Sequence, residues 1–135
     1  MDKMAKEQKI LISGMGEDGA QSLMQLLQSW GYSGIWVQDP QKLPQAISSH
    51  QPCLGLIDLD CQHHGTLEAL KSLRKDTPYF PVIVTTDQDS LEMERALRAL
   101  GIFYLCLKPY DPKELQLAIE RATHHLELEN ALYAS

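Results

Sequence analysis

The hydrophobic positions of the chain form five short strand-like runs, and stretches with apolar residues at three- and four-residue spacing alternate with them. Short continuous apolar runs are typical of strands buried on both faces of a parallel sheet, and the longer spacing is typical of amphipathic helices. This alternation predicts the α/β class, a doubly wound parallel sheet with right-handed crossovers and helices on both faces. The predicted strands are 9–13, 35–37, 54–59, 81–86 and 103–107.

Capping signals mark where several of the predicted helices begin and end. Gly31 follows the first helical pattern as a C-terminal stop. Asp89 and Glu92 stand three residues apart, which is the spacing of a capping box with aspartate as the cap. Asp111 and Pro112 supply a cap and a first-position proline, and so predict the start of the last helix.

The last helical pattern runs on from Pro112 without a stop signal, further than a single domain requires. We therefore expect an N-terminal extension over 1–8, one domain over 9–122 and a helical extension over 123–135. The extension would form a short coiled coil in a homodimer or lead into an output domain outside this segment. A frayed tail with a slightly apolar face is the alternative.

Composition narrows the class of partner. The 135 residues carry a formal net charge of −6, which argues against a nucleic-acid-binding surface. No apolar run approaches the length of a membrane span, and the polar N-terminal residues lack a signal-peptide core. Three cysteines at no metal-finger spacing favour reduced thiols and a cytoplasmic location.

Chemistry-bearing residues gather at the ends of the predicted strands, with Asp58 as the strongest candidate. A carboxylate within an apolar run is costly unless the strand is ending and the side chain reaches a cleft. Ligands of open α/β sheets sit at the carboxyl ends of the strands, where Asp60, Thr86 and Lys108 also fall. The carboxylate could accept a phosphoryl group, while the hydroxyl and the ammonium hold its oxygens.

Three motifs resemble those of response regulator receiver domains, over a match that runs through about 9–122. They are PCLGLID, which ends in Asp58, PVIVTT, which ends in Thr86, and GIFYLCLKPYDPKEL, which contains Lys108 and Pro109. Each motif is modest alone, but three in the right order and at the right spacing make a strong resemblance.

The resemblance implies a flavodoxin-like fold with strand order 2-1-3-4-5. Asp58 would be the phosphoacceptor, Thr86 the hydroxyl that closes on the phosphate, Lys108 the oxygen partner and Pro109 its cis-proline neighbour. The chain would then be a cytoplasmic signalling module that accepts a phosphoryl group from a histidine kinase or a phosphotransfer protein. Apart from that acceptance it would be no enzyme.

The first predicted strand departs from the receiver pattern. Receivers end it with two or three acidic residues that bind Mg²⁺, and the matching positions here are Gly14, Met15 and Gly16. Mg²⁺ requires near-octahedral oxygen ligands, so Asp58 and a backbone carbonyl near Asp60 would hold it weakly. Two functions therefore stay open: a phosphoacceptor receiver, and a phosphorylation-independent pseudo-receiver that acts as a dimerisation or docking module.

The switch position departs from the pattern as well. Receivers carry an aromatic switch residue three positions before the lysine; that position is Leu105 here, with Tyr104 one residue early. The resemblance places the output surface around the fourth and fifth helix and strand region.

A glycine motif supports a third, less favoured function. Gly14, Gly16 and Gly19 form a literal GxGxxG between a predicted strand and a predicted helix, and Asp39 stands about where a ribose-binding acid would. The two acidic residues inside the motif place negative charge where a pyrophosphate would bind. A small nucleotide-binding domain is therefore the alternative to the receiver.

Overall fold

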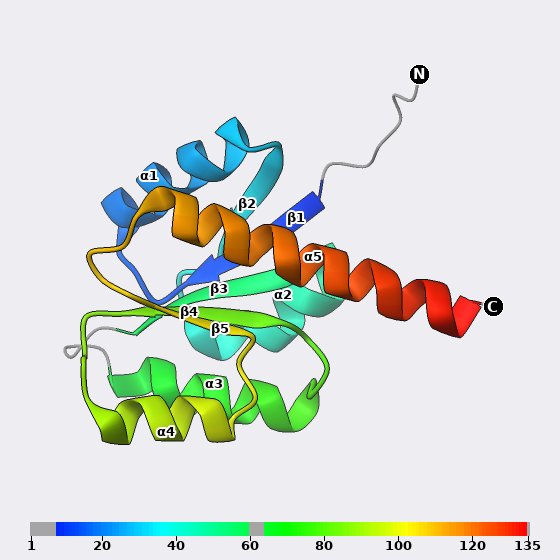
Figure 1. Ribbon diagram of the computed structural model, residues 1–135. Coiled ribbons are helices and arrows are strands. Elements are labelled where there is room, and N and C mark those ends of the chain that lie inside the picture. Colours follow the sequence, from blue (N-terminus) through cyan, green and yellow to red (C-terminus); the bar gives the residue numbers. More distant parts are fainter. Residues whose placement is uncertain (1–7, 60–63, 135) are drawn as a thin grey trace.

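The computed structural model describes residues 8–59 and 64–134, which contain one parallel sheet of five strands in the order β2-β1-β3-β4-β5 (Figure 1). This confirms the predicted fold class and the strand order that the resemblance implied. The strands are β1 (Gln8–Ser13), β2 (Tyr32–Trp36), β3 (Leu54–Leu59), β4 (Val82–Thr86) and β5 (Tyr104–Leu107).

Helices cover both faces of the sheet. Figure 1 shows α1 and α5 on one face and α2, α3 and α4 on the other. The helices are α1 (Glu17–Ser29), α2 (Leu43–His50), α3 (His64–Asp76), α4 (Leu91–Ala99) and α5 (Pro112–Ala134), with a short 3₁₀ helix, η1 (Pro40–Lys42), before α2. Within the described residues, none of the helices combines the length and the apolar character that a bilayer crossing demands.

Two hydrophobic layers flank the sheet because successive side chains of a strand point to opposite faces. Ile10 and Ile12 of β1 belong to the layer under α1 and α5, whereas Leu11 between them belongs to the layer under α2, α3 and α4. All six residues of β3 are buried, so β3 is the centre of the sheet. A polar side chain at its carboxyl end is therefore held by neighbours on both sides.

Strand β2 is longer than the sequence predicted. It begins at Tyr32 rather than Ile35, and Tyr32 pairs with the first residue of β1. Ser33 and Gly34 interrupt the apolar pattern, so the pattern did not predict the first half of this strand. Gly34 is packed closely, because a Cβ atom there would lie 2.8 Å from Cγ of Met24 on α1.

Capping residues account for the starts of α4 and α5. The predicted cap at Asp89 is wrong by one residue: Ser90 is the N-cap, and its Oγ accepts the Met93 backbone N–H at 3.1 Å. The serine hydroxyl meets the geometry of a cap directly before the first helical residue. The cap predicted at Asp111 is confirmed, because its carboxylate accepts the Lys113 backbone N–H at 2.9 Å.

Helix α5 extends well beyond the sheet. It has 23 residues, which corresponds to a length of about 34 Å. Ala122 and Thr123 are still buried against the domain, and the helix then projects past the sheet toward the C-terminus (Figure 1).

Candidate functional site

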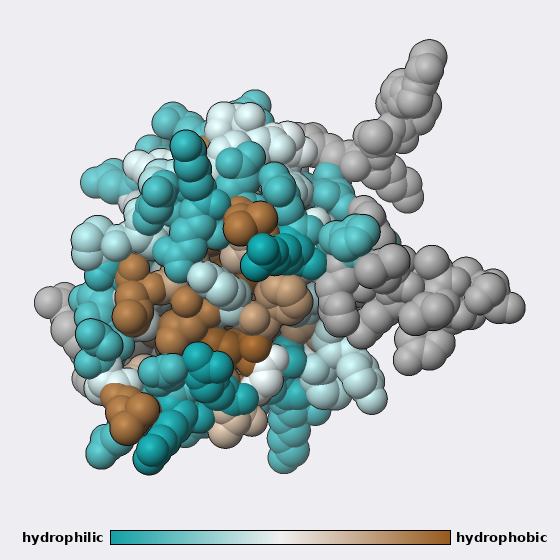
Figure 2. Space-filling model, viewed as in Figure 1, coloured by the Kyte–Doolittle hydropathy of each residue, from teal (hydrophilic) through white to brown (hydrophobic). Residues whose placement is uncertain are grey.

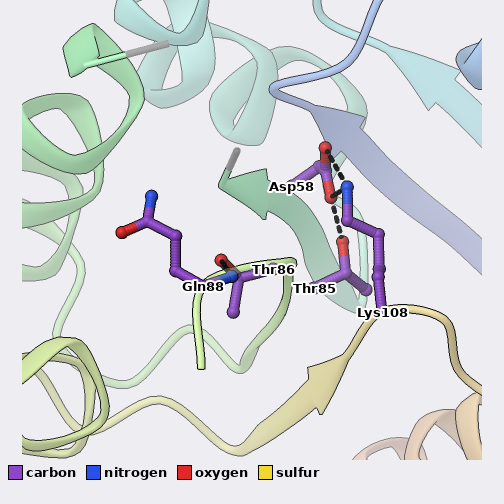
Figure 3. Close-up of polar contacts among 5 residues, drawn as sticks. All are labelled: Asp58, Thr85, Thr86, Gln88 and Lys108. Atoms are coloured by element: carbon purple, nitrogen blue, oxygen red, sulfur yellow. Dashed lines mark hydrogen bonds and ion pairs between the residues drawn. The ribbon is translucent and has the colours of Figure 1, made fainter. Parts of the chain in front are cut away.

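Asp58 lies near the carboxyl end of β3 with only 7% of its surface exposed. Its register partner on β4 is Thr85, and residues level with one another on parallel neighbours share a face of the sheet. The Thr85 hydroxyl donates a hydrogen bond of 2.6 Å to Oδ1 of Asp58 (Figure 3). The buried hydroxyl therefore has an acceptor, and the buried carboxylate has a hydrogen-bond donor.

Lys108, directly after β5, supplies the positive charge of the site. Its Nζ lies 2.8 Å from Oδ1 and 3.1 Å from Oδ2 of Asp58, and the lysine side chain is 32% exposed. The Lys108 backbone N–H donates to the Thr86 carbonyl at 2.8 Å, and the Lys108–Pro109 peptide bond is cis, as the resemblance implied. The ammonium is thus aimed across β4 at the carboxylate on β3.

The two consecutive threonines of β4 behave differently. Thr86 is buried, and its hydroxyl oxygen accepts the Gln88 backbone N–H at 3.1 Å. Figure 3 shows Thr85 and Lys108 converging on Asp58, while Thr86 lies beside Gln88. The structure therefore brings together Asp58 and Lys108 as predicted, and adds Thr85, which is not among the predicted site residues.

Two ionisable groups at and after the end of β5 have raised pKa values. Burial raises the pKa of the Cys106 thiol to about 12. Burial also raises the pKa of the Tyr110 phenol, with smaller contributions from Cys106 and from the negative charge of Asp58. Both groups are therefore protonated at neutral pH. In the described part of the chain, Lys108 is the cation paired with Asp58.

The loop after β1 packs directly against the acid. Gly14 has a φ of +92°, and a Cβ atom placed on it would lie 2.0 Å from the backbone carbonyl oxygen of Asp58. Only glycine accommodates both the positive φ and this approach. Met15 packs against the hydrophobic layer under α1 and α5. The loop therefore packs the Gly14 backbone against Asp58, while the Met15 side chain packs against the core.

The predicted nucleotide loop has its own local explanation. The Asp39 carboxylate accepts the Gln41 backbone N–H at 3.0 Å and so caps η1. Gly16 caps α1, and Glu17 and Asp18 occupy the first turn, where a phosphate would need positive potential. A Cβ atom on Gly19 would touch the Met15 side chain at an ordinary 3.5 Å. These contacts favour a structural role for the glycine motif.

The residues at the predicted switch position face a groove between α4 and β5. Leu105 is half-buried and lines a cavity of about 280 Å³ there. The Tyr104 hydroxyl donates to Oε2 of Glu114 on α5 at 2.8 Å, and this hydrogen bond is the main reason that the pKa of Tyr104 is raised. Tyr104 therefore links β5 to α5 along the surface.

An apolar patch lies over β5. Phe103, Tyr104 and Leu107 are each 36–42% exposed. Figure 2 shows brown side chains gathered between α4 and α5, over β5, within a mostly hydrophilic surface. We call this set of three residues the β5 patch. An exposed apolar patch rimmed by polar residues is a candidate interaction surface.

The sheet order and the buried acid paired with a lysine define a doubly wound α/β module with a polar site at the carboxyl ends of its strands. The chain belongs to the response regulator receiver domain family. The model of that family matches residues 17–120. The chain is 28% identical over 107 residues to the transcriptional regulatory protein ZraR of Klebsiella oxytoca, covering 78% of this chain and 24% of ZraR. It is 33% identical over 84 residues to the DNA-binding transcriptional regulator NtrC of Proteus hauseri, covering 62% of this chain and 18% of NtrC.

The fold matches solved receiver structures. The receiver domain protein (CheY-like) of Methanospirillum hungatei JF-1 superposes with a TM-score of 0.81 at 23% identity, covering 92% of this chain and 99% of that one. The chain spans about a quarter of the length of the ZraR proteins it matches. Receiver domains are generally non-enzymatic phosphoryl acceptors that interact with histidine kinases or phosphotransfer proteins.

Receiver domains typically bind Mg²⁺ at the phosphorylation site, but the described residues do not fit the ion. Mg²⁺ takes six oxygen ligands in near-octahedral geometry. Gly14, Met15 and Gly16 supply no carboxylate, and the described residues contain no group of three His, Cys, Asp or Glu side chains that could hold a metal. Asp60, whose carbonyl was a predicted ligand, lies outside the described residues.

Proposed function

We propose that this chain is the input module of a cytoplasmic two-component regulator and that Asp58 accepts a phosphoryl group from a histidine kinase or a phosphotransfer protein. The observation that carries the proposal is the contact of Lys108 Nζ with both carboxylate oxygens of a nearly buried acid. The family membership supports the same assignment. The chain would have no catalytic activity beyond this acceptance.

The hydrogen bonds distinguish the two oxygens of Asp58. Oδ1 accepts from Thr85 at 2.6 Å and lies 2.8 Å from Lys108, whereas Oδ2 has the Lys108 contact at 3.1 Å. Among the residues that the structure describes, fewer donors hold the lone pairs of Oδ2, which makes it the better nucleophile. It would bond to phosphorus while the phosphorus–nitrogen bond of a phosphohistidine breaks, and the electron pair of that bond would stay on the imidazole nitrogen.

Thr86 keeps its proposed role as the hydroxyl that closes on the phosphoryl group, on the resemblance alone. Its oxygen accepts the Gln88 backbone N–H, so the side chain would have to leave this bond to reach the phosphate. Leu105 and Tyr104 would form the switch position next to it.

A chemical donor tests the acceptor role. Incubation with acetyl phosphate is expected to add the mass of one phosphoryl group to the intact protein, and Asp58→Asn is expected to abolish the addition. Asp87→Asn removes an exposed carboxylate close to the same edge and should leave it unchanged. Intact mass spectrometry reads the result, and a chain that stays unmodified would contradict the proposal.

The second candidate function is a phosphorylation-independent docking module. It is favoured by the close approach of Gly14 to the Asp58 backbone and by the Thr85 hydrogen bond, which hold Asp58 without a phosphoryl group or an ion. In either function we propose the β5 patch, with α4 and α5, as the output surface. A partner bound there equally well by wild type and by Asp58→Asn would favour the second function.

We propose that residues 9–122 form the receiver and that 123–135 extend α5 into a dimer helix or a linker to an output domain. The helical pattern places Leu126 on the apolar seam of this extension. Leu126→Lys is expected to shift the chain from dimer to monomer in light scattering, because a charge on a coiled-coil seam is destabilising. Glu127→Lys, off the seam, is the matched control, and a dimer that survives Leu126→Lys would place the interface elsewhere.

A further inference from the structure

The carboxylate of Asp58 is held by the protein's own donors on each side that the structure describes. Lys108 contributes the compensating charge at 2.8 Å and 3.1 Å, and Thr85 contributes a neutral donor at 2.6 Å. Thr85 is itself 96% buried, since only 4% of its surface is exposed. A buried charge requires a partner and satisfied lone pairs, and these two residues supply both.

The space in which receivers carry metal ligands is filled differently here. A carboxylate at position 14 would need a Cβ atom 2.0 Å from the Asp58 carbonyl oxygen, which the backbone excludes. Met15 has an apolar side chain packed against the core layer under α1 and α5. The packing of the loop against β3 therefore excludes an acidic side chain at position 14, and the core contact of Met15 replaces one at position 15.

We infer that this pocket is a metal-independent variant of the receiver site, in which Thr85 and Lys108 together perform the charge-holding task and Thr85 acts as a positioning residue for Asp58. The inference rests on the proposed acceptor role only for its kinetic consequence. Thr85 fixes Oδ1 and thereby presents Oδ2 to the incoming phosphorus. Where other receivers hold the acid with a metal ion, this site would hold it with the Thr85 hydrogen bond and the Lys108 charge.

Metal independence is tested by a Mg²⁺ titration of the full chain. The unfolding temperature, measured at matched ionic strength with MgCl₂ or NaCl, is expected to be the same, because an ion that does not bind the native state cannot stabilise it. Tryptophan fluorescence should likewise show no saturable change, although Trp36 lines the cavity beside Gly14 and Met15. A saturable Mg²⁺ effect that disappears in Asp58→Asn would overturn the inference.

The positioning role is tested with an isosteric pair of variants. Thr85→Val removes the hydroxyl and keeps the shape, and is expected to lower the rate of acetyl phosphate labelling by about tenfold. Thr85→Ser keeps the hydroxyl and should restore most of the rate. In an Asp58→Asn background, Thr85→Val should lower the unfolding temperature less than it does in wild type, since the pair is coupled. Equal effects in both backgrounds, or no rescue by serine, would contradict the role.

The two proposals fail in different ways. Labelling at the same rate in EDTA and in Mg²⁺ supports both of them, and labelling that requires Mg²⁺ supports the acceptor role while overturning the metal-independent pocket. No labelling in either condition overturns the acceptor role; the Mg²⁺ titration and the coupling between Thr85 and Asp58 then still decide the inference.

Discussion

Gly14→Ala is expected to lower the free energy of unfolding by about 3–5 kcal/mol. Two effects add. The φ of +92° is unfavourable for any residue with a Cβ atom, and that atom would lie 2.0 Å from the Asp58 carbonyl oxygen. Relief of the contact would require the loop to move away from β3 and would disturb the acid that β3 carries.

Gly16→Ala is the matched control for this prediction. Gly16 lies two residues further along the same loop, its φ is −77°, and a Cβ atom there would meet nothing within 4 Å. Because alanine is a poorer N-cap than glycine, we expect a loss of less than about 1 kcal/mol. Urea unfolding followed by circular dichroism measures both variants, and losses of similar size would show that the close approach at Gly14 is unimportant.

Arg74→Met is expected to destabilise the domain by about 3 kcal/mol. The guanidinium donates to four backbone carbonyls, at 3.0 Å to Leu100, 2.6 Å to Pro78, 3.2 Å to Gly101 and at short range to Phe80. These bonds tie the end of α3 to the turns that lead into β4 and β5. Burial lowers the pKa of Arg74 from its ordinary value, and at neutral pH the group is still charged. Methionine keeps an unbranched apolar stem and leaves the carbonyls without their donor.

Lys75→Met removes a neighbouring charge from an exposed position and should change stability by less than about 0.5 kcal/mol. Hydrogen exchange adds a second measurement, because amides of the β5 edge should exchange faster in Arg74→Met than in Lys75→Met. If the two variants unfold at the same urea concentration, the carbonyl cluster contributes nothing to stability.

The fold could be predicted from sequence because its signals are local. Five apolar runs, helical spacing between them and caps such as Asp111 need no knowledge of distant contacts, and the structure places strands at all five runs. The errors also have local causes. Ser33 and Gly34 hid the first half of β2, and the neighbouring candidates Asp89 and Ser90 could not be ranked as caps without backbone angles.

The site was predictable only in part because it depends on register. Asp58 and Lys108 stand out as single polar residues at the ends of apolar runs, but Thr85 and Thr86 are adjacent and chemically identical. Which hydroxyl faces Asp58 follows from the pairing of Asp58 with Thr85 between β3 and β4. The same holds for Gly14, whose approach to the Asp58 carbonyl is a contact between the loop after β1 and strand β3 that no spacing rule reveals.

Helix α5 combines first turns that are packed on the sheet with a second part that extends beyond it (Figure 1). Its first three turns are packed on the sheet through Leu115, Ile119 and Ala122, while the part beyond Ala122 is about 18 Å long. Any small tilt imposed on the packed turns is magnified at the far end in proportion to that length. Tyr104 is bonded to Glu114 in the first turn, so a displacement of β5 that tilts those turns would move the distal turns further than the packed ones.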